Sequence, residues 1–331
     1  MNSSYNYIKQ LIQQTSPTFS YSGDFSKWQP AARAKLRELL GMDRFVSCEP
    51  DLEIEYTQEI ENAVEIRFTF ESEPGYRVPC HLLLPVGVKN PPLMITLQGH
   101  SPGMHISLGR AKEEAEVEKI NNGDRDFCVR AIKEGFAAIA MEQRNFGERA
   151  DVDKRRCLSP ALTNLLMGRT TIGERVWDTM RLIDVVIKEF SDKVDTSCIS
   201  LMGNSGGGTT TAYTAALEDR IVLAMPSSAM STFKDSIGAM YHCPCNYVPH
   251  MAEYFDMGDL MAMAAPKYFV QVNGVEDPIF PIDSAKEVFE KGLAAYKSLG
   301  AEDKAVLVVG PEGHRFYADA AWPYVHKFLG R

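Results

Sequence analysis

Short apolar blocks recur along this 331-residue chain, separated by longer stretches in which apolar residues return every three or four positions. The short blocks predict buried strands, at residues 92–97, 137–141, 198–202, 221–225, 268–272 and 305–309. The longer stretches predict helices, over residues 126–134, 173–190, 209–217, 284–298 and 318–329. Strands that alternate with helices indicate an α/β fold with a mostly parallel central sheet and helices on both faces.

The pattern differs in the first 100 residues. Residues 1–50 have a helical pattern, clearest over 28–40 and ended by Gly41, and we expect them to form an N-terminal extension. Alternating runs at 52–56, 64–70 and 78–84 predict antiparallel strands that lead into the main sheet. Residues 51–331 are therefore expected to form one domain. Within it, the irregular stretch 226–265 is too long for a simple loop and predicts a lid or a pocket wall.

Composition narrows the class of partner. The net charge of −9 argues against nucleic acid and against anionic membranes as main partners. The sequence has no run of 18 apolar residues and no secretory signal at its start, so we expect a cytoplasmic protein without a membrane span. The seven cysteines are scattered, mostly in apolar runs, which fits a reducing compartment. The oligomeric state is left open.

The segment Gly203-Asn204-Ser205-Gly206-Gly207 lies between the strand predicted at 198–202 and the helix predicted at 209–217. A G-x-S-x-G pattern in this context is typical of a nucleophile elbow, a tight strand-to-helix turn that exposes the serine hydroxyl. The N–H of Gly206 would then lie at a helix N-terminus, where a developing oxyanion is stabilised. A glycine-rich turn with an ordinary N-cap serine, or a phosphate cradle, is the alternative.

A serine nucleophile needs a base and an acid, which follow it along the chain in this type of fold. His314 is the predicted base, because it lies in a loop directly after the strand predicted at 305–309. Asp277 follows the preceding strand and is the predicted acid, with the neighbouring Glu276 as the alternative. His326, within the last helix, is expected to be structural.

The loop 98–103 follows the strand predicted at 92–97 and should supply the second oxyanion donor. We expect this donor to be the backbone N–H of His100, with that of Ser101 as second choice. The imidazole of His100 is expected to line the pocket.

Cys243 and Cys245, with His242 and His250 nearby, are candidate ligands of a metal ion. Two cysteines in a C-x-C arrangement lack the paired C-x-x-C spacing of a structural zinc site, so we expect no metal. Nor do we expect an organic cofactor. The methionines at 251, 257, 261 and 263 are expected in the core or in an apolar pocket wall.

Four segments in order along the chain resemble the acetyl xylan esterase and dienelactone-hydrolase-like branch of the α/β-hydrolases: residues 98–100, residues 173–181, the elbow and the Asp277/His314 pair. The resemblance covers about residues 60–331. It implies the α/β-hydrolase fold and a serine hydrolase that cleaves carboxylic esters through an acyl-enzyme. Its family-level substrate is a small-molecule ester, an acetyl group on a carbohydrate. In that branch Asp178 and Arg181, on the helix before the nucleophile strand, are expected to be structural.

The expected border of the substrate pocket consists of Gln98, Ser101, Arg144, Asn204, Cys243 and Tyr247. The chain departs from the family at Gln98, where many esterases have histidine, and at residues 142–147, where the usual segment is Asp-x-Arg-Gly. Arg144 therefore either contacts a substrate oxygen or anchors its loop. A prolyl-oligopeptidase-like peptidase, a dienelactone-type hydrolase and a non-catalytic binding protein of the same fold are the alternative functions.

Overall fold

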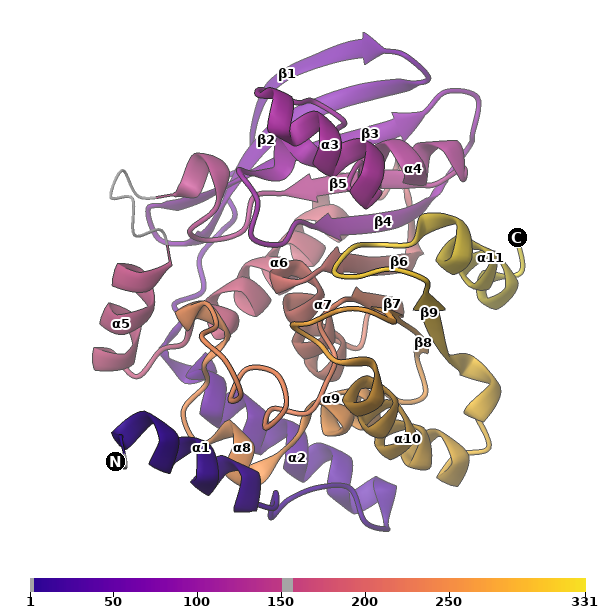
Figure 1. Ribbon diagram of the computed structural model, residues 1–331. Helices are drawn as coiled ribbons and strands as arrows, with labels where there is room; N and C mark the ends of the chain where they lie inside the picture. The colour runs from indigo at the N-terminus through magenta and orange to yellow at the C-terminus, as the bar shows by residue number, and fades with distance from the viewer. Residues whose placement is uncertain (1–2, 151–156) are drawn as a thin grey trace.

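The computed structural model describes residues 3–150 and 157–331, in which nine strands form one sheet (Figure 1). The strand order is β1-β2-β3-β5-β4-β6-β7-β8-β9. The first three strands are antiparallel to one another and β3 is antiparallel to β5, whereas all later pairs are parallel. The bounds are β1 Glu53–Ile60, β2 Ala63–Glu73, β3 Tyr76–Pro85, β4 Pro92–Leu97, β5 Ala137–Met141, β6 Asp195–Asn204, β7 Ile221–Ser227, β8 Tyr268–Gly274 and β9 Ala305–Gly310. The mostly parallel sheet with an antiparallel lead-in confirms the predicted fold class.

Helices cover both faces of this sheet (Figure 1). On one face α4 and α11 pack against strand side chains such as Met94 and Val270. On the other face lie α6, α7 and α10, with α9 packed between α7 and α10. The bounds are α1 Ser4–Gln14, α2 Phe25–Leu40, α3 Glu114–Gly123, α4 Phe127–Lys133, α5 Leu158–Leu166, α6 Thr171–Glu189, α7 Gly206–Leu217, α8 Met251–Tyr254, α9 Met257–Ala264, α10 Ile282–Ser298 and α11 Ala318–Leu329. None of the described helices is long and apolar enough to cross a bilayer.

The N-terminal helices are attached to the sheet domain through a shared core. Helix α2 turns Trp28, Ala32, Leu36 and Leu40 into the same buried cluster as α7 and α9. It ends where Gly41 takes φ 72°, a conformation that glycine adopts without strain. One face of α2 thus belongs to the core of the sheet domain, although this helix precedes the first strand.

The stretch 226–265 has two structural parts. Residues 228–250 form an irregular segment that contains a short 3-10 turn at Pro244–Asn246. Helices α8 and α9 follow, and every residue of α9 is buried. Its N-terminus is closed by a capping box, in which the side chains of Asp256 and Asp259 each accept from the other's backbone N–H. The irregular part borders a pocket, while the methionines at 251, 257, 261 and 263 lie in the core.

Candidate active site

Ser205 is held in a strained turn between β6 and α7, with φ 55° and ψ −121°. A non-glycine residue adopts this conformation only where the surrounding structure imposes it. Here the imposing contact is close packing, since a Cβ on Gly207 would lie 2.0 Å from the carbonyl oxygen of Leu97. The N–H of Ser205 donates to the carbonyl of Ser227 at 2.8 Å, which fixes the turn to β7. The sequence therefore places a serine side chain at the carboxyl end of the sheet.

The loops after β8 and β9 bring a carboxylate and an imidazole together. His314 Nδ1 and Asp277 Oδ2 are 2.8 Å apart. The other oxygen of Asp277 accepts from the N–H groups of Ile279 at 2.8 Å and Phe280 at 3.1 Å. Burial opposes ionisation of Asp277, but the hydrogen bonds from His314 and the two N–H groups outweigh it and keep the pKa of Asp277 below its usual value. The alternative acid, Glu276, is exposed.

Ser205 and His314 line one pocket of about 500 Å³ at this edge of the sheet. Part of its wall is the irregular segment after β7, including Tyr241, Cys243 and Pro244. Tyr241 is 85% exposed and stands at the rim. The pocket is large enough for a small ester group and part of the molecule that carries it.

The loop after β4 approaches the elbow closely enough to contribute an oxyanion donor. A Cβ on Gly99 would lie 2.6 Å from the carbonyl oxygen of Asn204 and 2.9 Å from Cβ of Ser205. The N–H of Ser101 already donates to Gly99 at 2.8 Å. Among the described residues the N–H of His100 has no acceptor, and its ring lies beside Gly206. Of the two predicted second donors, His100 is thus the one whose N–H is free to meet a substrate.

Five of the residues predicted to border the pocket lie outside its lining. Gln98 is buried and donates to Ser107 Oγ and to the carbonyl of Arg125, both at 2.7 Å. The remaining four are Ser101, Asn204, Tyr247 and Arg144. Ser101 is buried in its own loop. Asn204 accepts a hydrogen bond from Ser227 Oγ, and the Tyr247 hydroxyl donates one to the carbonyl of Ile237. Each of these polar groups serves the local structure.

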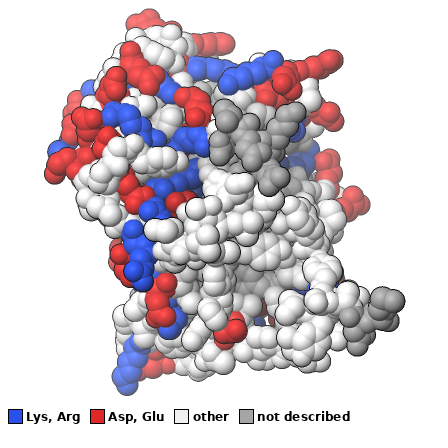
Figure 2. Space-filling model, turned by 90° about the vertical axis from the view of Figure 1, so that its left-hand side faces the viewer, with Lys and Arg blue, Asp and Glu red and all other residues white. Residues whose placement is uncertain are grey.

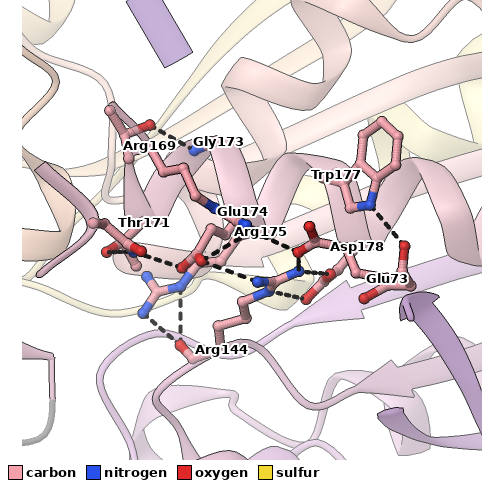
Figure 3. Close-up of polar contacts among 12 residues, drawn as sticks. Glu73, Arg144, Arg169, Thr171, Gly173, Glu174, Arg175, Trp177 and Asp178 are labelled. Carbon is pink, nitrogen blue, oxygen red and sulfur yellow. Dashed lines mark hydrogen bonds and ion pairs between the residues drawn. The ribbon is translucent and has the colours of Figure 1, made fainter. Parts of the chain in front are cut away.

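Arg144 lies in a buried ion-pair network with Glu73, Glu174 and Asp178 (Figure 3). Its distances to these carboxylates are 2.8, 3.0 and 2.8 Å. Asp178 also pairs with Arg149 at 2.7 Å, so its partners are arginines of the loop after β5 and not Arg181. Arg144 therefore anchors its loop, which is one of the two roles considered for it.

Two polar residues that line the pocket, Arg125 and His242, are not among the residues predicted to border it. Arg125, just before α4, faces the pocket, and its Nε has no partner among the described residues. Burial lowers its pKa to about 10. His242 also lines the pocket, and burial, together with the imidazoles of His100 and His314, lowers its pKa to about 4. Both come from polar loops whose position depends on the tertiary fold.

Four potential metal ligands meet at the pocket wall: His100, Cys157 and Cys243 line the pocket, and Cys245 is buried. The ligand atoms of His100, Cys157, Cys243 and Cys245 all lie within 4.8 Å of one another. The two histidines near Cys243 and Cys245 in the sequence are not members of this group. His242 contacts Asn246, and His250 is exposed and pairs with Glu253. The contacts of Cys157 with Cys243 and Cys245, together with the nearby His100 and Arg175, hold the pKa of its thiol well below the usual value.

No protein-family model matches the chain. A protein named "Putative hydrolase YtaP" from Bacillus subtilis is 25% identical over 243 residues, which are 72% of this chain and 78% of that protein. Among solved structures, a "putative acetyl xylan esterase" from Bacteroides fragilis superposes with a TM-score of 0.76 at 16% identity, covering 98% of this chain and 84% of that one. A glucuronoyl esterase from Solibacter usitatus superposes with a TM-score of 0.69 at 13% identity, covering 95% and 96%. The predicted α/β-hydrolase fold, and the likeness to acetyl xylan esterases, are confirmed by these superpositions.

Proposed function

We propose that this chain of α/β-hydrolase fold is a serine esterase whose chemical steps use no cofactor. The observation that carries the proposal is the opening of one pocket onto both Ser205, in its strained turn, and His314, which is bonded to the buried Asp277. A nucleophile, a base and an acid that orients the base are the elements that acyl transfer requires.

In the proposed mechanism His314 takes the proton of the Ser205 hydroxyl as the oxygen attacks the ester carbonyl. Asp277 holds the Nδ1 proton, so that Nε2 is the basic nitrogen. The negative charge that develops on the carbonyl oxygen is stabilised by the N–H groups of Gly206 and His100. His314 then protonates the leaving alcohol, and water releases the acyl group by the reverse sequence of proton transfers.

The proposed substrate is a small acyl ester on a carbohydrate, with acetyl as the first acyl group to test. Support comes from the names of the superposed structures, which include acetyl xylan esterases and glucuronoyl esterases. It also comes from the exposed Tyr241 at the rim, because an aromatic face can stack on a sugar ring. Figure 2 shows that the side of the molecule carrying α5 and α1 has a broad surface with few charged residues, which suits an uncharged ligand.

Turnover of four substrate types separates this proposal from its alternatives: an aryl acetate, an acetylated xylo-oligosaccharide, a methyl glucuronate and an aminoacyl amide. We expect hydrolysis of the first two, loss of it in Ser205→Ala, and a fluorophosphonate adduct on Ser205 by peptide mass spectrometry. Cleavage of the amide alone would identify a peptidase. A wild-type protein that cleaves none of the four and takes up no fluorophosphonate would refute the esterase proposal.

A further inference from the structure

The group formed by His100, Cys157, Cys243 and Cys245, here called the thiol cluster, brings together three separate loops. His100 lies in the loop after β4, Cys157 precedes α5, and the other two cysteines belong to the 3-10 turn in the segment after β7. In the reaction proposed above, the three sulfurs have no role.

The spacing within the thiol cluster fits a tetrahedral ion. Zinc binds thiolate sulfur at about 2.3 Å, which places the sulfurs of a tetrahedral site ~3.8 Å apart. The Cys243 and Cys245 sulfurs are 3.1 Å apart, His100 Nε2 is 3.2 Å from Cys245 Sγ, and no pair of ligand atoms exceeds 4.8 Å. Small movements of side chains would bring all four atoms to bonding distance of one ion.

A buried arginine supplies the charge that such a centre requires. Arg175 is fully buried, and its guanidinium donates to Cys245 Sγ and Cys157 Sγ, both at 3.5 Å. Its other hydrogen bonds go to the backbone carbonyl of Arg144 (Figure 3). No carboxylate in the described part of the chain lies within ion-pair distance of Arg175. A buried cation needs a compensating anion, and one zinc ion with three thiolates and a neutral imidazole carries a net charge of −1.

We propose that the thiol cluster binds one zinc ion through His100, Cys157, Cys243 and Cys245. Three thiolates and one imidazole form a closed set of four protein ligands, which is the arrangement of structural zinc sites. Phe146 packs its ring edge-on against His100 and joins the cysteines in a small apolar cluster, so the ion would have apolar groups on the side away from the pocket, which His100, Cys157 and Cys243 line. A disulfide would use only two of the sulfurs and would give His100 no partner.

The ion would fasten the pocket wall to the loop that carries an oxyanion donor. His100 provides its ring to the cluster and its backbone N–H to the substrate, so the ring fixes where that N–H points. This consequence rests on the proposed esterase function, whereas zinc binding itself does not. Loss of the ion should therefore lower kcat more than it raises KM, because the donor acts on the transition state.

Metal analysis of the purified full-length protein, with any affinity tag removed, tests the site. We expect about one zinc per chain, and Cys245→Ser should lose most of it. Cys198→Ser is the matched control, since Cys198 is a partly buried thiol of β6 outside the cluster and its replacement should leave the zinc content unchanged. Protein loaded with Co²⁺ should show thiolate-to-cobalt charge-transfer absorption, which a surface-bound ion would not give.

The competing outcomes are separable. A disulfide among Cys157, Cys243 and Cys245, found by mass mapping of the alkylated unreduced protein, would overturn the proposal. So would zinc that stays in Cys245→Ser, or a wild-type protein that stays metal-free when expressed in zinc-supplemented medium. Arg175 donates to two of the ligand sulfurs, so Arg175→Met should weaken zinc binding by about 10- to 100-fold, measured by competition with a chelator. Because none of these readouts is turnover, an inactive protein that binds zinc would refute the esterase proposal alone.

Discussion

Replacing Asp277 by Asn should place the His314 proton on the wrong nitrogen. Asp277 Oδ1 accepts from two N–H groups, those of Ile279 and Phe280, while Oδ2 faces His314 Nδ1. In Asp277→Asn the amide oxygen takes the place that faces the two N–H groups, and the NH₂ group then points at His314. Since an NH₂ group only donates, Nδ1 must accept and the ring proton moves to Nε2. The imidazole can then no longer take the proton of Ser205.

The size of the loss follows from these contacts. To restore the productive tautomer the amide must turn over, which leaves two buried N–H groups without an acceptor. Each costs about 1–3 kcal/mol, so the productive form is disfavoured by about 2–6 kcal/mol. At about 1.4 kcal/mol for each factor of ten, kcat should fall by about 30-fold to about 2 × 10⁴-fold.

Steady-state hydrolysis of an aryl acetate measures this effect, with thermal unfolding as a check that the variant folds. KM should change little, because neither residue 277 nor the tautomer of His314 alters binding of a small ester. Glu276→Gln is the matched control, since this exposed neighbour should keep wild-type activity. An Asp277→Asn variant with more than a third of the wild-type kcat would refute the reasoning, and an inactive Glu276→Gln would assign the acid to Glu276.

Three further predictions concern a buried carboxyl group, a pocket arginine and a glycine of the elbow. Burial raises the pKa of Glu142 to about 7 against the N–H groups of Met104 and Glu148. The folded protein thus binds this proton more tightly than the unfolded chain does. The resulting contribution to the free energy of unfolding is fully present below about pH 4.5 and is lost as the pH rises through 7. This loss amounts to at most about 3 kcal/mol. Glu142→Gln should flatten the decline in urea-unfolding free energy between pH 5 and pH 8, and parallel pH curves would contradict this. Arg125→Met should raise KM for an acetylated sugar by about tenfold, the value of one charged hydrogen bond, and change kcat/KM for an aryl acetate by less than about threefold; equal effects on both substrates would show that Arg125 does not contact the sugar. Gly207→Ala, whose Cβ would meet the Leu97 carbonyl at 2.0 Å, should cost about 3 kcal/mol or more, whereas Gly23→Ala, with open space around it, should leave the midpoint of unfolding unchanged.

The predicted elements are most accurate where apolar runs end at turn-forming residues. The strands 92–97 and 137–141 and the helix 318–329 have the predicted bounds, and each of them ends directly before a polar residue or a glycine. Helix α9 was not predicted, and the reason is physical. It is buried on every side, so its sequence Met257–Ala264 has no polar face and no helical alternation to reveal it. Packing against α7 and α10 stabilises this segment as a helix, and these tertiary contacts cannot be read from the local sequence.

Some residues of the candidate site are predictable from the order of the strands, and others depend on tertiary contacts. Ser205, Asp277 and His314 each follow a recognisable strand, and the carboxyl ends of parallel strands share one edge of the sheet, so their meeting is predictable from order alone. The thiol cluster depends on the contact of His100 with Cys245, which are 145 positions apart on irregular loops. Spacing rules for metal ligands apply to ligands on one hairpin or helix, and they give no signal for such a set.

The two halves of the oxyanion hole are supported by different means. The N–H of Gly206 is fixed by the elbow, because the close packing of Gly207 against Leu97 restricts the backbone conformation there. The N–H of His100 lies beyond the end of β4, in a loop that the sheet does not hold. Its ring contacts are with Phe146 and Cys245, which belong to other loops, and with Gly206. A donor must stay within a few tenths of an ångström of its place to stabilise a transition state. The precision of this site therefore depends on what joins those loops, and the thiol cluster is where the three of them meet.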